Sequence, residues 1–186
     1  MTSSRTKAAQ AGIKGESVDN AVVAPISVSS AYVRADPGAP GAFDYARTGA
    51  PGRAELERAL ADLEGAAGAV AVSSGMAAID LVLNLVPNQA RVVCAHDCYG
   101  GTRRLMDARA AQRGFDLVYA DASDAAALEA AIGDAADLVF LESPSNPRLR
   151  ITDIQAACAS ARRAGALSVV DNTVLSAVQQ KPLALT

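Results

Sequence analysis

The feature that most constrains the fold is a regular alternation of short apolar runs and amphipathic stretches over residues 69–170. The runs are apolar at nearly every position, as in parallel strands buried on both faces, and helical periodicity follows each of them. This pattern predicts an α/β domain whose mostly parallel sheet has helices on both faces. The predicted strands are 69–73, 91–95, 115–119, 137–141 and 166–170, and the predicted helices are 53–64, 75–86, 101–113, 124–132 and 153–164.

The N-terminal part of the chain does not show this alternation. Residues 1–20 are polar and small, which predicts a flexible or partner-clasping arm. Residues 21–32 are rich in β-forming residues but contain Pro25, which favours an extended segment on a surface over a central strand. We therefore expect an N-terminal arm and loop over residues 1–52, followed by the α/β domain over residues 53–186.

Charge and hydropathy exclude several classes of partner. The net charge of −3 gives no electrostatic footprint for nucleic acid. No apolar run reaches the roughly 18 residues that a membrane span needs, and the N-terminus lacks the apolar core of a signal peptide. We expect a cytoplasmic protein that binds neither nucleic acid nor a membrane.

Motifs for other kinds of site are also missing from the sequence. The three cysteines are an odd number without an export signal, which argues against a disulfide framework. Cys94, His96 and Cys98 have no second ligand pair at zinc spacing, so no metal site is expected. The sequence contains no G-x-G-x-x-G after the first strand, no G-x-x-x-x-G-K-[ST] and no G-x-S-x-G, so dehydrogenase, P-loop and serine-hydrolase functions lose support.

Polar residues follow the predicted strands at their carboxyl ends, where ligands of parallel sheets bind. Ser74 and Gly75 open a helix, whose free N–H groups and dipole favour a phosphate. Asp171 ends the last predicted strand and adds a carboxylate at the same edge. A ligand with a phosphate at one end and a cationic group at the other fits this pair, and pyridoxal phosphate is such a ligand.

Tyr45 and Arg47 stand two positions apart in an irregular loop. In extended backbone this spacing points both side chains the same way, so that they can grip one anion. An exposed loop with an ordinary surface arginine is the alternative, and the loop alone favours it.

Five stretches together resemble a known family. In order and spacing, the chain resembles the Cys/Met-metabolism family of fold-type I pyridoxal-phosphate enzymes, of the cystathionine γ-synthase type. The resemblance implies an incomplete cofactor-binding large domain of the aspartate aminotransferase-like fold. The stretches are Asp44-Tyr-Ala-Arg47, Ser73-Ser-Gly-Met76, Ala95-His-Asp-Cys-Tyr-Gly-Gly-Thr102, Glu142-Ser-Pro-Ser-Asn-Pro147 and Val169-Val-Asp-Asn-Thr173.

The resemblance assigns the residues that contact the cofactor phosphate, including those of a loop at the interface between subunits, called the dimer loop. It implies that the backbone N–H groups of Gly75 and Met76 bind the cofactor phosphate, with Ser74 as a support. It also implies that Tyr45 and Arg47 reach the phosphate in a neighbouring subunit's site, which overturns the interpretation of their loop as an ordinary surface.

The resemblance also assigns residues around the cofactor ring. Tyr99 would stack on the ring and Asp171 would pair with its N–H, which makes these two the catalytic residues of this chain. Asn146 would lie beside the phenolic oxygen, and Thr173 and Glu142 would be supports. A helix cap at Tyr99, a turn at Asn146 and a helix N-cap at Asp171 are the structural alternatives.

The sequence departs from the family pattern at two places. Ala50 and Gly52 replace hydrogen-bonding residues of the dimer loop, and Val174 stands where the family tends to have Phe. Family members bind the cofactor covalently through a lysine beyond the aspartate, and this chain reaches Thr186 before that point. Lys181 matches a non-catalytic position, so we expect the lysine and the C-terminal domain to come from a second polypeptide.

Three hypotheses follow for function. The first is a split enzyme, not competent alone, that replaces the γ-substituent of an O-acyl-homoserine with a thiol to give cystathionine, in a homo- or hetero-oligomer such as a dimer of dimers. Elimination, as in a γ-lyase, would use the same residues. The alternatives are a non-catalytic protein that binds the cofactor or a homologue, or a fragment of an ordinary single-chain enzyme.

Overall fold

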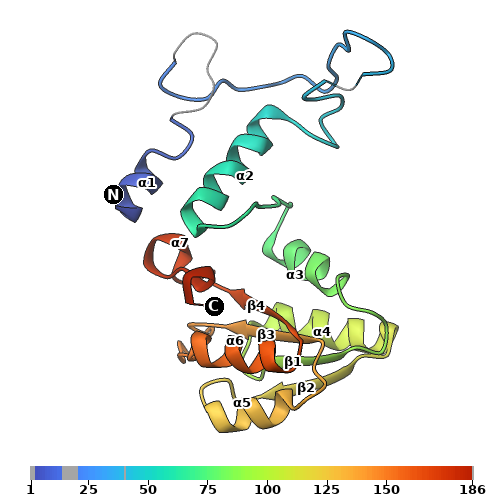
Figure 1. Cartoon of the computed structure of the whole chain (residues 1–186), viewed down its shortest axis with the longest axis vertical. Helices are drawn as coiled ribbons and strands as arrows, with labels where there is room; N and C mark the ends of the chain where they lie inside the picture. Colours follow the sequence, from blue (N-terminus) through green and yellow to red (C-terminus); the bar gives the residue numbers. More distant parts are fainter. Residues whose placement is uncertain (1–2, 14–20, 40, 186) are drawn as a thin grey trace. The chain divides into compact units, whose positions relative to one another are not determined.

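The computed structural model describes residues 3–13, 21–39 and 41–185. The chain divides into two compact units, Met1–Ala71 and Val72–Thr186 (Figure 1). The arm predicted for the first twenty residues lies partly outside the described residues, at 1–2 and 14–20. The domain boundary predicted between residues 52 and 53 stays a prediction.

The first unit contains two helices, α1 (Ser4–Ala9) and α2 (Pro51–Glu64). The sequence analysis missed α1, which begins where the Ser3 hydroxyl accepts a hydrogen bond from Thr6 N at 3.2 Å. It predicted α2, which starts two residues before Arg53 because proline fits the first helical position. As predicted, Gly65 stops α2, which ends at Glu64, and the φ of 72° at Gly65 is the left-handed conformation that favours glycine.

The second unit is built on a parallel sheet of four strands. The strands are β1 (Arg91–Ala95), β2 (Asp116–Ala120), β3 (Leu138–Glu142) and β4 (Leu167–Asp171), in the order β2-β1-β3-β4. All three pairings are parallel, so the carboxyl ends of the strands meet at one edge. The predicted parallel sheet is confirmed.

Helices cover both faces of this sheet, as predicted. One apolar cluster joins α3 (Gly75–Leu83) and α4 (Gly100–Arg113) to alternate strand residues such as Cys94 and Phe140. The other joins α5 (Ala125–Ile132) and α6 (Ile154–Arg163) to the intervening residues, among them Val93 and Val139. This alternation is the two-residue period of a strand. The unit ends with α7 (Ser176–Gln179) and the 3-10 helix η1 (Pro182–Leu185).

The predicted strand at 69–73 is wrong. These residues form no strand, and the side chains of Val70 and Val72 are exposed to solvent. A β-strand needs a neighbour for its ladder of hydrogen bonds, and no segment in the described ranges pairs with 69–73. The apolar run therefore predicted buried side chains, whereas the structure leaves Val70 and Val72 exposed.

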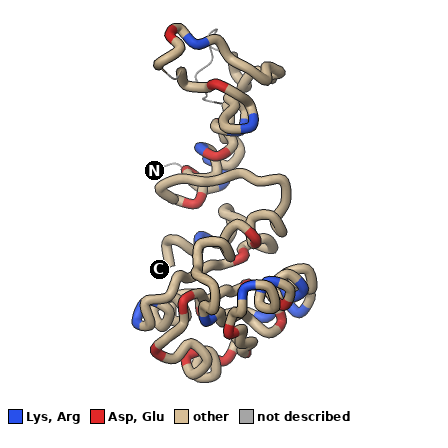
Figure 2. Tube along the Cα trace, turned by 90° about the vertical axis from the view of Figure 1, so that its right-hand side faces the viewer, with Lys and Arg blue, Asp and Glu red and all other residues tan. Residues whose placement is uncertain are grey.

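Arginines of α4 hold α3, whose N-terminus opens toward the strand edge. Arg109 donates two hydrogen bonds to Asp80 of α3, at 2.6 and 2.7 Å. Arg113 donates to the carbonyl oxygens of Leu83 and Val86 and thereby caps the C-terminal end of α3. Figure 2 shows such basic positions in blue, interspersed with acidic ones in red. The helix α3 stops at Leu83, three residues before its predicted end.

Among the described residues, no helix has both the length and the apolar character that a membrane crossing requires.

Candidate active site

One hollow at the carboxyl edge of the sheet collects most of the predicted site residues. Its volume is about 290 Å³, close to the lower end of the roughly 300–1,000 Å³ typical of ligand pockets. Seven of the nine predicted site residues line it, and they come from three loops and a helix start. The lining residues are Ser74, Gly75, Met76, Ile79, Tyr99, Glu142, Asn146, Asp171, Thr173 and Val174.

The N-terminus of α3 forms one wall of the hollow. Ser74 is the N-cap, and its hydroxyl oxygen accepts a hydrogen bond from Ala77 N at 3.1 Å. The first backbone bond of the helix runs from Ala78 N to Ser74 O, so the geometry of the helix gives Gly75 N–H and Met76 N–H no acceptor within it. These two donors face a site with the positive end of the helix dipole behind them, which suits a phosphate.

Asp171 stands at the carboxyl end of β4 and is half-buried. Its Oδ1 accepts a hydrogen bond from Thr173 N at 3.0 Å and another from the Thr173 hydroxyl. The contact orients the carboxylate and leaves Oδ2 for a ligand. The helix N-cap alternative is not what the structure shows, because Leu175 takes that position at α7.

Tyr99 and Asn146 come from the loops that follow β1 and β3. Tyr99 is the N-cap residue of α4, but its side chain makes no capping hydrogen bond and the residue is 46% exposed. The backbone N–H groups of both residues donate to the Glu142 carboxylate. The ring of Tyr99 and the amide of Asn146 are therefore both available at the hollow.

Gly101, which the sequence analysis did not single out, leaves room for the Tyr99 ring to lie against it. A Cβ at Gly101 would lie 2.5 Å from Tyr99 Cε1, which is too close for a real contact, and 3.0 Å from Met76 Sδ, which is a tight contact. Because the ring lies against the glycine, any side chain there must displace it. The Gly-Gly pair that opens a predicted helix was the sequence signal for this contact.

We predict that Gly101→Ala weakens the binding of a ligand that stacks on Tyr99 by about tenfold, since the ring must rotate away. Stability should change by less than about 1 kcal/mol, because alanine favours the helix by about that amount and offsets the crowding. Gly100→Ala is the matched control, since its Cβ would lie at an ordinary 3.6 Å from Arg104 Nη1. Ligand titration and urea unfolding of both variants test this, and equal affinity of the two would contradict it.

A polar network next to the hollow fixes the loop that carries Asn146. Arg150 donates to Asp121 Oδ2 at 2.7 Å and to the Ser123 hydroxyl, which ties the loop after β3 to the loop after β2. Arg150 N donates to Ser145 Oγ, and that hydroxyl donates to Asp97 Oδ2 at 2.7 Å, in the loop after β1. The hydrogen bond of the Ser123 hydroxyl, followed by that of Arg150, lowers the pKa of Asp121 to about 2.

The lowered pKa of Asp121 predicts a pH dependence of stability. Its ordinary pKa is about 3.9, so the network stabilises the fold fully above about pH 4 and loses this contribution as the pH falls through 2. Asp121→Asn should therefore show a shallower loss of stability than the wild type between about pH 4 and pH 2. Urea unfolding midpoints across this range measure the slope. Equal slopes for the variant and the wild type would refute the prediction.

The other two predicted site residues, Tyr45 and Arg47, belong to the first unit and form a local pair. Arg47 Nη2 donates to Tyr45 Oη at 3.3 Å, and the guanidinium lies 5.4 Å from the ring centroid. Both side chains are exposed, and Ala31 and Tyr45 form an isolated antiparallel bridge. The predicted parallel orientation of the two side chains fits this contact.

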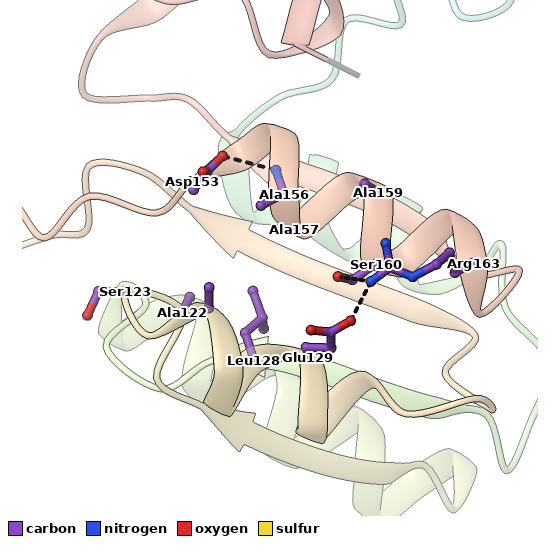
Figure 3. Close-up of a pocket in the computed structure, with 11 residues that line it drawn as sticks. Ala122, Ser123, Leu128, Glu129, Asp153, Ala156, Ala157, Ala159, Ser160 and Arg163 are labelled. Carbon is purple, nitrogen blue, oxygen red and sulfur yellow. Dashed lines mark hydrogen bonds and ion pairs between the residues drawn. The ribbon is translucent and has the colours of Figure 1, made fainter.

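A second hollow, of about 200 Å³, lies between α5 and α6. Figure 3 shows alanines in its walls, among them Ala156 and Ala157, together with polar and charged side chains. Its charged side chains already have partners, because Arg163 pairs with Glu129 and Asp153 accepts from Ala156 N. This hollow is a packing groove between helices with short side chains.

Comparison with known proteins decides between the possible ligands of the first hollow. The model of the family described as Cys/Met metabolism PLP-dependent enzyme matches residues 5–186. The chain belongs to this family. Its cofactor is therefore pyridoxal 5'-phosphate, and the resemblance inferred from the five motifs is confirmed.

The chain is similar to several cystathionine enzymes. It is 45% identical to cystathionine gamma-synthase of Escherichia coli (strain K12) over 97% of the chain and 47% of the relative. It is 40% identical to cystathionine beta-lyase of Lactococcus lactis subsp. cremoris (strain MG1363), over 100% and 49%. The crystal structure of cystathionine gamma synthase from Xanthomonas oryzae pv. oryzae in complex with aminoacrylate and cysteine superposes with a TM-score of 0.94 at 44% identity, over 100% and 48%. Cystathionine gamma-lyases also match. The chain spans about half the length of these relatives.

The hollow fits the family's cofactor. A phosphate requires N–H donors, and the start of α3 offers two of them. A protonated ring nitrogen requires an acceptor, and Asp171 supplies a carboxylate on the same hollow. Tyr99 lines the same hollow, and its aromatic ring offers a stacking surface there.

Proposed function

We propose that this chain forms the cofactor half of an enzyme that replaces the γ-substituent of an O-acyl-homoserine with a thiol. A second polypeptide would supply the lysine that binds the cofactor covalently and the C-terminal domain. The observation that carries the proposal is the single hollow lined by the N-terminus of α3, Tyr99, Asn146 and Asp171. The 45% identity to a cystathionine gamma-synthase supports the replacement reaction.

Each residue of the hollow has a distinct task in this proposal. The N–H groups of Gly75 and Met76 bind the phosphate, and the Ser74 and Thr173 side chains hold the helix start and Asp171 in place. The carboxylate of Asp171 accepts the ring N–H and keeps that nitrogen protonated. Tyr99 stacks on the ring and Asn146 orients its phenolic oxygen. When bound, the cofactor supplies an electron sink for the charge that develops on the substrate.

Tyr45 and Arg47 complete the phosphate site of a neighbouring subunit in this proposal. The exposed guanidinium and phenol lie within hydrogen-bond distance of each other, so one phosphate can contact both. This task requires an oligomer, which supports the expectation of a partner chain.

Elimination is the alternative reaction. The match to beta-lyases and gamma-lyases at 40% identity favours it to a lesser degree. Both reactions use the same cofactor contacts from this chain, and the choice between them depends on how the site handles the leaving group and the incoming thiol.

The test reconstitutes the two halves. The chain is titrated with pyridoxal phosphate and then mixed with a separate polypeptide that corresponds to the remaining half of the Escherichia coli synthase. We expect cofactor binding by the chain, and formation of cystathionine from an O-acyl-homoserine and cysteine only in the mixture. Borohydride reduction and peptide mapping should find the cofactor on a lysine of the second polypeptide.

The outcomes separate replacement, elimination and non-catalytic binding. Release of the γ-substituent without uptake of cysteine would favour elimination. Cofactor binding without turnover in the mixture would favour a non-catalytic binding protein. A chain that binds no cofactor, alone or mixed, would overturn the proposal.

A further inference from the structure

The acidic side chain at the end of the central strand β3 is the least explained group of the hollow. Glu142 is only 4% exposed, although it carries a carboxylate and forms no ion pair with an arginine or lysine of the described residues. A carboxylate in such a place is costly unless its oxygens accept hydrogen bonds. The question is therefore which hydrogen bonds stabilise this buried carboxylate.

Both oxygens of Glu142 accept a backbone hydrogen bond. Tyr99 N donates to Oε2 at 2.7 Å, and Asn146 N donates to Oε1 at 2.7 Å. These distances are typical of charge-assisted bonds. Burial raises the pKa of Glu142, and the two N–H donors oppose that rise. Acceptance at both oxygens is the pattern of the ionised form.

The two donors belong to separate loops. Tyr99 follows β1 and Asn146 follows β3, and the strand pairing places Glu142 opposite Asp171 of β4. The carboxylate thus joins the loops after β1 and β3, and the backbone of the same residue pairs with the end of β4. Within the described part of the chain, neither N–H group has a backbone carbonyl as acceptor, so Glu142 fixes both.

We propose that Glu142 is a positioning residue that holds Tyr99 and Asn146 in a fixed position relative to Asp171. It acts through their backbone N–H groups and does not contact the substrate. The inference rests on the proposed function for the tasks of Tyr99 and Asn146. The Glu142 clamp, meaning the two hydrogen bonds that its carboxylate accepts, is a property of the folded chain and can be measured without the cofactor.

The main test variant is Glu142→Gln. Glutamine has nearly the same size, but its side chain has one oxygen and an NH₂ group that donates instead of accepting. One of the two backbone N–H groups must then lose its acceptor. Glu129→Gln, an exposed carboxylate on α5 paired with Arg163 (Figure 3), is the matched control. Glu142→Asp is a second variant, too short to reach both donors at once.

Two measurements on the full chain decide the matter. Amide hydrogen exchange should show roughly tenfold or greater loss of protection at Tyr99 or Asn146 in Glu142→Gln, while Val139 and Phe140 in β3 stay protected. The dissociation constant for pyridoxal phosphate should rise by roughly tenfold in the same variant, as expected for one lost charge-assisted hydrogen bond. Glu142→Asp should fall between the wild type and Glu142→Gln, and Glu129→Gln should match the wild type.

Wild-type protection of both N–H groups in Glu142→Gln would overturn the inference. So would lost protection with an unchanged dissociation constant, because the clamp would then position nothing that the cofactor needs. If β3 itself loses protection in Glu142→Gln, the same comparison in Glu142→Asp decides. A wild-type chain that binds no cofactor but loses protection on substitution would overturn the proposed function, and the clamp would stand as a feature of the fold.

Discussion

Asp171→Asn should lower the affinity of the chain for pyridoxal phosphate by roughly 10- to 100-fold. The asparagine side chain retains the shape and an acceptor oxygen, but it loses the negative charge that favours a protonated ring nitrogen. A hydrogen bond to a charged group contributes about 1.5–3 kcal/mol, and each 1.4 kcal/mol corresponds to a tenfold change. In the reconstituted enzyme the loss of turnover should be larger, because Asp171 would hold the ring nitrogen protonated and so support the electron sink that the cofactor would supply.

The measurement is a spectroscopic titration with pyridoxal phosphate, followed by the turnover assay. Asp134→Asn, in the exposed turn after α5, is the matched control. The Thr173 N–H still finds the asparagine oxygen as acceptor, so the urea unfolding midpoint should change little. Wild-type affinity in Asp171→Asn would remove Asp171 from the cofactor site.

Phe140→Ala should destabilise the second unit by about 3–5 kcal/mol, the range measured for buried phenylalanines. Phe140 is 1% exposed, lies in the central strand β3 opposite Cys94 of β1, and belongs to the cluster that joins α3 and α4 to the sheet. Truncation leaves a cavity that the neighbouring strands cannot close. Urea unfolding followed by circular dichroism measures the change in the free energy of unfolding.

Leu167→Ala is the control for this effect. Leu167 lies in the edge strand β4 and is 42% exposed, so its truncation removes little buried surface and should cost less than about 1 kcal/mol. Similar losses in both variants would mean that β3 is not the core of this unit.

The sequence predicted the sheet well because its strands are short apolar runs with a helix after each. The strands β1 to β4 lie within one residue of their predicted bounds. The same reasoning failed at 69–73, because an apolar run reports a tendency to be buried but not the presence of a pairing partner. It also failed at α1, which is a single short helix with a serine cap and no apolar stripe.

The prediction of the site followed from topology more than from individual side chains. A parallel sheet brings the carboxyl ends of its strands to one edge, which groups Tyr99, Asn146 and Asp171. Ser74 lines the same hollow although the residues before it, 69–73, form no strand. The two hydrogen bonds accepted by Glu142 could not be predicted from the sequence, since they depend on which loops lie next to the end of β3. The place of the Tyr99 ring over a glycine is likewise a matter of side-chain packing that spacing does not encode.

The strand order β2-β1-β3-β4 has a consequence for how the chain folds. Each wall of the hollow comes from a different stretch of sequence, and the walls meet only after three parallel pairings between distant segments have formed. Such non-local pairings form slowly, because the intervening chain must be ordered first. The cofactor can therefore bind only to the finished sheet: it should slow unfolding without speeding refolding, and its uptake is a signal that folding of this unit is complete.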